Sequence, residues 1–139
     1  MEYNLQRFVA AQAFTYERAL QEVKNGYKES HWMWFIFPQI KGLGHSEQSR
    51  FYAISSLMEA AKYLEHEILG ARLLEMTKEV LDSNITDATI IFGYIDVMKL
   101  LSSMTLFAQV KEAPPEFQQV IDKLYQGKPD IRTLEILKG

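Results

Sequence analysis

The chain has 139 residues, of which 47% are hydrophobic and 24% are charged, so we expect one folded domain spanning residues 1–139. Fifteen Lys and Arg residues against eighteen Asp and Glu residues give a formal net charge of −3. Because no basic block occurs, the composition disfavours a general nucleic-acid-binding surface. The absence of cysteine excludes disulfides, thiolate metal sites and cysteine nucleophiles.

No targeting segment is apparent in the sequence. The longest uninterrupted apolar run, residues 32–37, is far shorter than the ~20 residues of a membrane span. The first four residues, Met-Glu-Tyr-Asn, lack the basic and apolar regions of a signal peptide. We therefore expect a cytoplasmic protein that does not enter a membrane.

Residues 4–25 show the apolar spacing of one amphipathic helix. The apolar positions are Leu5, Phe8, Val9, Ala13, Tyr16, Leu20 and Val23. Asn4 is expected to cap this helix, because an Asn side chain accepts hydrogen bonds from the first free amides. Gly26 is expected to end it, because glycine adopts the left-handed conformation that closes the last turn.

The aromatic run that precedes Pro38 has no clear period. Its composition favours a strand, but a buried strand needs partners and the rest of the chain offers none. We therefore predict a short buried helix that begins at Ser30. Pro38 disfavours helical geometry at Phe37, which places the end of the helix there.

The middle of the chain contains a glycine-rich loop followed by two helical patterns. Gly42-Leu43-Gly44 forms the loop, and Ser46 can cap a helix that extends to about Leu64. A second helix is predicted for residues 68–81, because Asp82-Ser83-Asn84 breaks its pattern.

The remaining chain contains four helical segments, predicted at residues 87–92, 96–110, 115–125 and 130–137. Gly93 separates the first two segments, and Asp130 can cap the last. Pro114-Pro115 suits the first turn of the third helix. The sequence thus predicts an all-α, irregular domain of about seven unequal helices, not a four-helix bundle.

The common catalytic and metal-binding motifs are absent from the sequence. There is no Walker loop, GxGxxG, HExxH or GxSxG motif. His31, His45 and His66 are dispersed along the chain, so we expect no metal site, and no cofactor is indicated.

The segment from Lys28 to Gln39 contains both tryptophans of the protein, Trp32 and Trp34. Its apolar residues 35–37 are expected in the core, because large aromatic side chains are usually buried. Its polar flank, with Lys28 and His31, places a cation and a hydrogen-bonding ring beside two flat aromatic surfaces. Such a mixture suits a planar anionic ligand.

A second candidate region runs from Gly42 to Arg50. Glycines before a Ser46-capped helix start can form an anion site, because free amides and the helix dipole point towards it. His45, Ser49 and Arg50 add side-chain donors. The alternative is that Ser46 only caps the helix and Arg50 is solvated.

Lys99, Ser102 and Ser103 share the spacing of a Ser–Lys catalytic dyad on a helix. The neighbouring apolar residues indicate core packing instead, and no glycine-lined turn provides an oxyanion site. We expect that neither serine is a nucleophile.

Four segments carry a resemblance to a known family: residues 8–12, Lys28 to Gln39, Gly42 to Gly44, and Lys99 to Phe107. With the strings SHWMWFIFPQ and SSMTLF, the chain resembles the bacterial domain-of-unknown-function family 1810 over nearly its whole length. The resemblance implies a compact, all-helical cytoplasmic protein and carries no established activity. Relatives often have a basic residue where Leu101 stands, so the resemblance implies no anion site beside Leu101 in this chain.

We expect a small-ligand-binding protein whose pocket joins the two candidate regions, with a nucleotide or an ADP-ribose-like compound as the ligand. The ligand-binding residues would be Lys28, His31, Trp32, Trp34, Gln39, His45, Ser46, Ser49 and Arg50. A tryptophan would stack on the ligand, Lys28 and Arg50 would pair with its anionic groups, and a histidine would donate a hydrogen bond or transfer a proton.

Two alternatives remain open at this point. One is a protein-interaction module, including a homodimer, in which the aromatic run forms an exposed interface. The other is a hydrolase acting on a nucleotide-derived ligand, with Glu47 or Asp96 as the acid or base. A cleft beside the tryptophans favours ligand binding, whereas a flat apolar patch favours an interface.

Overall fold

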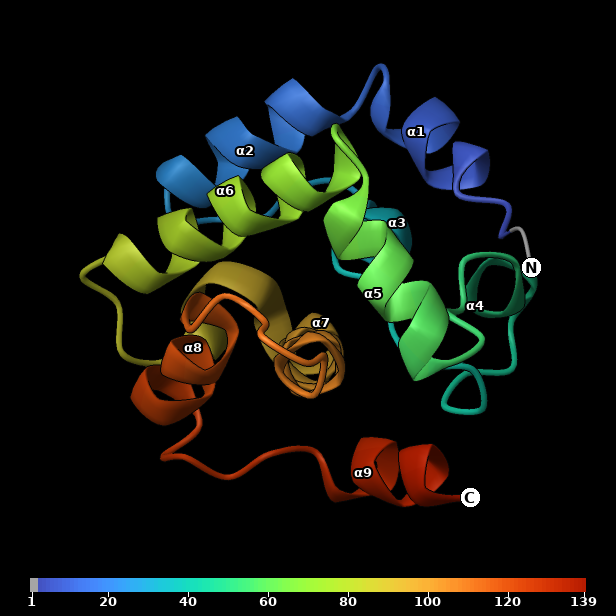
Figure 1. The fold of residues 1–139 in the computed structure, drawn as a ribbon. Coiled ribbons are helices and arrows are strands. Elements are labelled where there is room, and N and C mark those ends of the chain that lie inside the picture. The colour runs from blue at the N-terminus through green and yellow to red at the C-terminus, as the bar shows by residue number, and fades with distance from the viewer. Residues whose placement is uncertain (1–2) are drawn as a thin grey trace.

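The computed structural model describes residues 3–139, which form nine helices and no strand (Figure 1). The helices are α1 (Gln6–Gln12), α2 (Tyr16–Lys24), α3 (Met33–Ile36), α4 (Glu47–Phe51), α5 (Leu57–Glu65), α6 (Leu69–Asp82), α7 (Ala88–Ala108), α8 (Glu116–Leu124) and α9 (Ile131–Lys138). The predicted all-helical class is confirmed, but the described residues form nine helices and not about seven. Two predicted helices are each divided, whereas the segments predicted at residues 87–92 and 96–110 join in the kinked helix α7.

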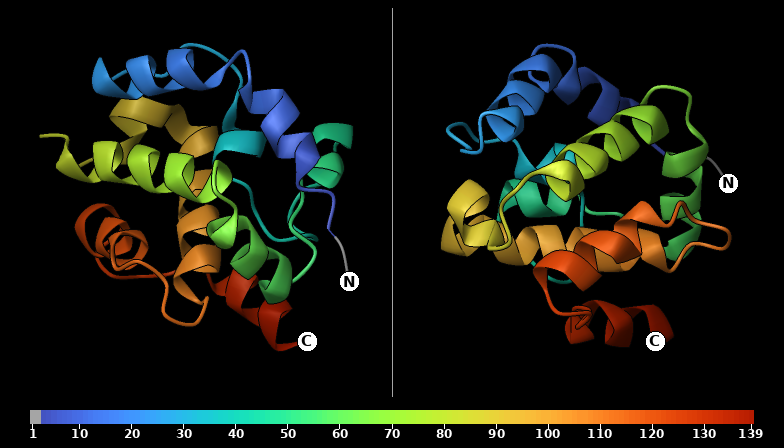
Figure 2. Two further views of the ribbon diagram at one scale, coloured as in Figure 1. Left: turned by 45° about the horizontal axis from the view of Figure 1, so that its top comes forward. Right: turned by 90° about the vertical axis from the view of Figure 1, so that its left-hand side faces the viewer.

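Helix α7 lies at the centre of the arrangement and contacts α3, α5, α8 and α9 (Figures 1 and 2). Residues 100–107 of α7 are all buried, so this part of the helix is surrounded on every side. Helix α6 forms the second layer and contacts α2, α5 and α8. The buried hydrophobic residues form one core cluster around these two helices.

The long helix α7 is kinked at Gly93, where the sequence predicts an interruption. Gly93 has φ 78° and ψ 173°, a conformation that is favourable only for glycine. Asp87 caps the first half, because its side chain accepts a hydrogen bond of 3.0 Å from Thr89 N. The kink turns the two halves of the helix in different directions and leaves residues 93–95 exposed.

Helix α7 is also long and apolar enough to cross a membrane. The longest uninterrupted apolar run in the sequence did not indicate this, because polar residues interrupt the apolar ones in α7. Within its most apolar window, 61% of the residues are buried inside the fold. A mostly buried apolar helix of this kind is typical of a protein core.

The helix predicted for residues 4–25 is divided into α1 and α2. The division follows Gln12, which is buried and donates hydrogen bonds to Phe35 O at 2.7 Å and to the Tyr63 hydroxyl at 3.1 Å. Holding this amide in the core turns the chain, so that Phe14 is 98% exposed. Asn4 does not cap α1, because Leu5 occupies the N-cap and no side chain serves there.

The predicted end of that segment at Gly26 is confirmed. Gly26 has φ 80°, and its amide donates to Val23 O at 2.9 Å. The amide of Tyr27 donates to Glu22 O at 3.1 Å, which completes a Schellman motif.

The helix predicted from Ser46 to Leu64 is divided into α4 and α5 by an extended segment. Ile54, fully buried in that segment, forms an isolated parallel bridge with Ile40. Lys41 N donates to Ile54 O, and Ile54 N donates to Gln39 O, each at 2.8 Å. The bridge holds the loop that follows Gln39 beside α4.

The buried side chain of Arg7 stabilises the same extended segment. Its guanidinium donates to Phe51 O at 2.7 Å and to Ala53 O at 2.8 Å, and forms an ion pair of 3.1 Å with Glu59. Ser56 then caps α5 by accepting a hydrogen bond from Glu59 N. These polar contacts explain the break, which hydrophobic spacing alone does not indicate.

The short helix predicted before Pro38 is present as the four-residue helix α3, but it begins at Met33 and not at Ser30. Phe37 has the non-helical angles φ −123° and ψ 73°, as expected for a residue that precedes proline. Ile36 and Phe37 are buried, whereas Phe35 is only partly buried and packs against Tyr52 at 5.4 Å between ring centroids. The expectation that all three side chains lie inside the core is therefore wrong for Phe35.

The remaining helices match their predictions closely. Asp130 caps α9 by accepting a hydrogen bond of 3.1 Å from Thr133 N, and Pro115 is the N-cap of α8.

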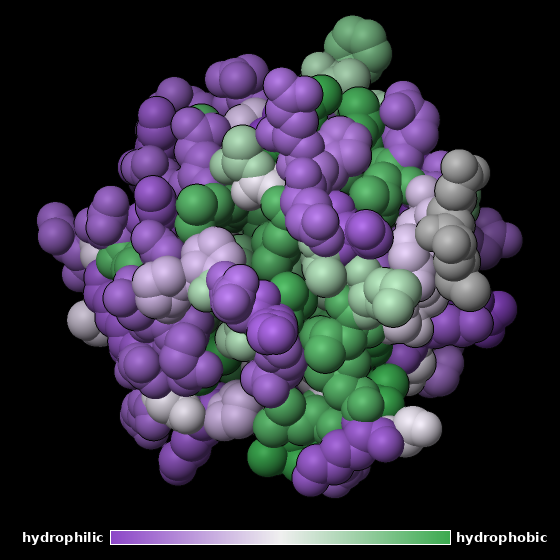
Figure 3. Space-filling model, in the orientation of Figure 1, coloured by the Kyte–Doolittle hydropathy of each residue, from purple (hydrophilic) through white to green (hydrophobic). Residues whose placement is uncertain are grey.

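On the face seen in Figure 3, hydrophobic residues gather in a band across the middle and lower part of the surface.

Candidate functional site

The tryptophan segment before α3 is attached to α2 by the buried carboxylate of Glu22. Ser30 Oγ donates to this carboxylate at 2.6 Å, Trp32 Nε1 at 2.9 Å and Glu29 N at 2.8 Å. Burial alone would raise the pKa of Glu22, but the hydrogen bonds from Ser30, Trp32 and Glu29 lower its pKa to about 2. Glu22 was not predicted to have this role, because its only signal in the sequence is a charge on the buried side of a helix.

Trp32 is 0% exposed and packs against Phe37 and Phe92. A ring with no exposed face has no surface on which a ligand can stack. The stacking role expected for Trp32 is therefore corrected to a packing role. Trp34, which is partly exposed, borders two surface pockets, whereas Trp32 belongs to the lining of only one of them.

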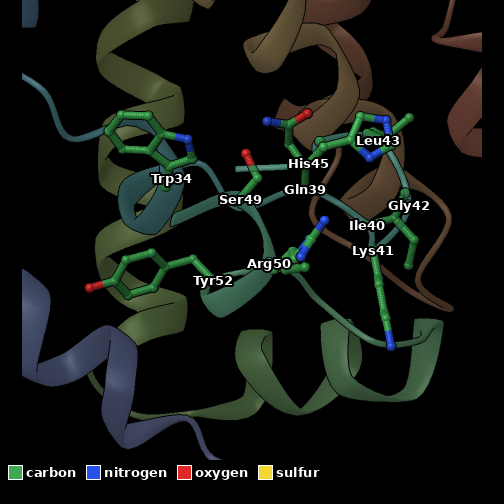
Figure 4. Close-up of a pocket in the computed structure, with 12 residues that line it drawn as sticks. Trp34, Gln39, Ile40, Lys41, Gly42, Leu43, His45, Ser49, Arg50 and Tyr52 are labelled. Carbon is green, nitrogen blue, oxygen red and sulfur yellow. The ribbon is translucent and has the colours of Figure 1, made fainter. Parts of the chain in front are cut away.

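The glycine loop, α3 and α4 enclose a pocket of about 220 Å³, which we name the glycine-loop pocket (Figure 4). Five of the nine predicted ligand-binding residues line it: Trp34, Gln39, His45, Ser49 and Arg50. It thus joins the end of the tryptophan segment to the glycine loop. Lys28 and His31 do not line this pocket and belong to a neighbouring one.

Aromatic and polar side chains occupy different parts of the glycine-loop pocket. In Figure 4, Trp34 and Tyr52 lie on one side, His45 and Leu43 lie on the opposite side, and Ser49 and Arg50 come between them. Arg50 is exposed, as in the alternative reading of this helix start, and has no ion-pair partner within residues 3–139. The pocket therefore offers an unneutralised guanidinium between an aromatic wall and a histidine.

Gly44 is required for the close approach of the loop to α4. A Cβ atom at this position would lie 2.5 Å from Ser49 Oγ and 2.6 Å from Ser49 Cβ. Gly42 has φ 109°, which also favours glycine. The glycines that the sequence suggested as an anion cradle have this geometric role in shaping the pocket.

Ser46 does not line the pocket and is exposed. Its hydroxyl accepts a hydrogen bond of 3.1 Å from Ser49 N and lies 2.8 Å from Ser49 Oγ. It therefore caps α4, a helix of five residues, and occupies the amide that an anion would need. The predicted anion site at this helix start is corrected to a cap, and the exposed Glu47 also lies outside the pocket.

A second pocket of about 210 Å³, which we name the tryptophan pocket, lies beside the first and shares Trp34 with it. Its charged residues are Lys28, Asp96 and Lys99, and His31 also lines it. Lys28 Nζ lies 2.8 Å from Asp96 Oδ2 and 5.0 Å from the centre of the Trp32 ring. Lys28 thus pairs with Asp96 within the protein.

Lys99 lies where the tryptophan pocket meets a third pocket. Its Nζ is 3.4 Å from Asp96 Oδ1 and 4.6 Å from the centre of the Trp34 ring. The third pocket, of about 250 Å³, is named the α9 pocket and is lined by Lys99, Ser102, Asp130 and Arg132 among others. Lys99 therefore borders two of the three pockets.

The α9 pocket is continuous in its lining with the glycine-loop pocket. Four residues line both: Gln39, Leu43, Gly44 and Ser49. Among the residues that the structure describes, five cationic side chains and two carboxylates line the three pockets. The cations are Lys28, Lys41, Arg50, Lys99 and Arg132, and the carboxylates are Asp96 and Asp130. The region is locally cationic although the chain is acidic overall.

The helix that carries Lys99 does not form a Ser–Lys pair within the part of the chain that the structure describes. Ser102 Oγ lies 3.1 Å from both Met98 O and Asp130 Oδ2. Ser103 is 0% exposed, and its hydroxyl has no hydrogen-bond partner among residues 3–139. Leu101 is also buried and does not line the α9 pocket, so it is a core residue.

No group of three metal-ligating side chains occurs among the described residues. His31 and His45 line different pockets. His66 accepts hydrogen bonds at Nδ1 from Ile68 N at 3.1 Å and Leu69 N at 3.3 Å, so its role is at the start of α6.

These features define a small, all-helical protein with a cationic surface site and without a known catalytic motif. The chain belongs to the family described as "Protein of unknown function (DUF1810)", which it matches over residues 2–137. It is also similar to a conserved hypothetical protein, Rv1873 from Mycobacterium tuberculosis, whose crystal structure is known. The identity is 45%, the TM-score is 0.96, and the match covers 99% of this chain and 98% of that one. No curated protein matches the chain.

Proposed function

We propose that this protein binds a small anionic ligand with a planar ring, such as a nucleotide or an ADP-ribose-like compound, in the glycine-loop pocket. The observation that carries the proposal is the position of Arg50. Its guanidinium, unpaired within residues 3–139, shares a concave site with the partly exposed ring of Trp34. Arginine binds phosphate and carboxylate groups through two parallel hydrogen bonds, so this pairing suits an anion attached to a ring.

Each lining residue has a role that its chemistry supports. Trp34 stacks on the planar ring, and Arg50 binds the anionic group. Gln39, His45 and Ser49 supply hydrogen bonds that orient the ligand. The pocket of about 220 Å³ is smaller than the roughly 300–1,000 Å³ of typical ligand sites. A nucleotide therefore extends from it into a neighbouring pocket.

The same proposal describes a soluble, cytoplasmic protein that binds neither nucleic acid nor a membrane. Its support is the acidic net charge and the burial of most of the apolar helix α7. A hydrolase activity has no comparable support. Asp96 is bound by two ammonium groups, and Glu47 lies outside the pockets.

A thermal-shift titration tests the proposal with three ligands: inorganic phosphate, AMP and ADP-ribose. Because a ligand that binds only the folded state stabilises it, AMP and ADP-ribose should raise the melting temperature of the wild-type protein. Arg50→Gln should reduce this shift. Lys62→Gln, which removes one exposed cation on α5 outside the three pockets, is the control and should keep the full shift. Equal shifts in both variants, or no shift in the wild type, would reject the site.

A second candidate function is self-association, which one observation favours. Four large apolar side chains on α7, on both sides of the kink, are more than half exposed: Ile90, Tyr94, Ile95 and Met98. Exposed apolar patches mark interaction sites. The aromatic run expected to form such an interface is instead mostly buried, so this patch replaces it. We expect the wild type to form a dimer that Tyr94→Lys dissociates. Sedimentation of the two proteins tests this expectation.

A further inference from the structure

We propose that the α9 pocket is a second anion subsite, so that the ligand carries two anionic groups, as a nucleoside diphosphate or a pyrophosphate-linked nucleotide does. This inference rests on the proposed function and names the class of ligand for the same site. It starts from Lys99 and Arg132, the two cations that line the α9 pocket.

The charges around Asp96 leave Lys99 under-compensated. One carboxylate serves two ammonium groups, and Lys28 is the closer at 2.8 Å. Lys28 also donates to Ser30 O, and only 7% of its side chain is exposed, so it is fully engaged. Lys99, at 3.4 Å from Asp96 and 23% exposed, keeps donors free for another partner.

Lys99 is also held in place. The ion pair with Asp96 and the position of its ammonium 4.6 Å from the centre of the Trp34 ring fix the end of a side chain that is otherwise flexible. A cation that is already ordered loses little side-chain entropy when it binds an anion. Preorganisation of this kind is expected at a binding site.

Among residues 3–139, Asp130 is the only carboxylate that lines the α9 pocket, and it is already hydrogen-bonded. Asp130 accepts from Thr133 N, Thr133 Oγ1 and Ser102 Oγ. Arg132 has no ion-pair partner within residues 3–139. The pocket therefore presents two cations whose charge Asp130 only partly offsets, an arrangement that favours an anion.

The shared lining makes one ligand able to reach both subsites. Gln39 and Ser49 border the glycine-loop pocket and the α9 pocket alike. A ligand whose ring lies against Trp34 and whose first phosphate meets Arg50 can pass these two residues. Its second phosphate then meets Lys99 and Arg132. A monophosphate occupies only the first subsite.

Calorimetric titration with AMP and with ADP, in EDTA and at constant ionic strength, tests the inference. The wild type should bind ADP at least about tenfold more tightly than AMP, because the second phosphate gains charge-assisted hydrogen bonds. Arg132→Gln should abolish this preference and leave the AMP affinity unchanged. Arg50→Gln should weaken both ligands, and Lys62→Gln should change neither. Arg132 is exposed, so its variant is expected to fold normally.

The outcomes separate this inference from the proposed function. Equal affinities of the wild type for AMP and ADP, or equal losses for both ligands in Arg132→Gln, would overturn the second subsite and keep the first. No binding of either ligand would reject the proposed function, and the second subsite with it.

Discussion

Trp32 Nε1 donates a hydrogen bond of 2.9 Å to Glu22 Oε1, which joins the indole of one tryptophan to the buried carboxylate of α2. The same carboxylate accepts hydrogen bonds from Glu29 and Ser30, so it attaches this part of the segment before α3 to α2. Because Trp32 is held inside the core, Trp34, two residues later, reaches the wall of the glycine-loop pocket. The hydrogen bonds of Glu22 therefore position the aromatic side of the candidate site.

Replacing Glu22 with Gln should destabilise the protein in a pH-dependent way. The folded-state pKa of about 2 lies below the usual value of 4.5, so the ionised carboxylate stabilises the fold by about 3 kcal/mol above pH 4.5. This contribution decreases as the pH falls from 4.5 towards 2. Chemical denaturation of wild type and Glu22→Gln at pH 7 and pH 3 measures it.

The difference in free energy of unfolding between these two proteins should be about 3 kcal/mol at pH 7 and less than about half of that at pH 3. Carboxylates other than Glu22 are common to both proteins and cancel in the comparison. A difference that does not depend on pH would show that the carboxylate is not held in its ionised form by these hydrogen bonds.

Replacing Phe37 with Ala should cost about 3–5 kcal/mol, because its ring is fully buried against Trp32 and Phe92. Phe35→Ala is the matched comparison, since Phe35 lies in the same segment but is only partly buried. Its cost should be smaller. Denaturant titration of the two variants would contradict the assigned burial if Phe35→Ala were the more destabilising.

The close approach of Gly44 to Ser49 can be tested by a rescue experiment. Gly44→Ala should cost about 1–3 kcal/mol, because the added Cβ atom would lie 2.6 Å from Ser49 Cβ. Adding Ser49→Gly removes the obstructing side chain and should recover part of that loss. The four thermal melts of this double-mutant cycle measure the coupling. Simple addition of the two single costs would show that the loop does not pack on α4 as described.

Neither serine of α7 should react with a fluorophosphonate probe. Ser103 is fully buried, Ser102 lies beside Asp130, and no hydrogen bond joins either serine to Lys99 within residues 3–139. Intact-mass measurement after treatment should therefore find the unmodified protein. A stoichiometric adduct that is lost in Lys99→Ala would make a hydrolase the better account.

Hydrophobic spacing and end residues were sufficient to predict most helices. Gly93, Pro115 and Asp130 lie at the kink and helix starts where local chemistry places them. The divisions after Gln12 and after Phe51 were not predictable in this way. They depend on hydrogen bonds and an ion pair between residues far apart in the chain, made by Gln12 and Arg7.

The candidate site was predictable only in part, for a related reason. The sequence predicted Trp34 and Arg50 as ligand-binding residues. They share a pocket because the Ile40–Ile54 bridge places the glycine loop beside α4. It did not distinguish the buried Trp32 from the partly exposed Trp34. Trp32 is bonded in the core to Glu22, which lies ten residues earlier on α2.

The two tryptophans also allow the most direct test of ligand binding in the glycine-loop pocket. The protein has two indole N–H groups, which give separate signals in a proton–nitrogen NMR spectrum, and Trp34→Phe assigns them. On titration with AMP, the Trp34 signal should shift in a saturable way, whereas the signal of Trp32, buried and bonded to Glu22, should not. An unchanged Trp34 signal at saturating AMP, or a shift confined to Trp32, would contradict the proposed site.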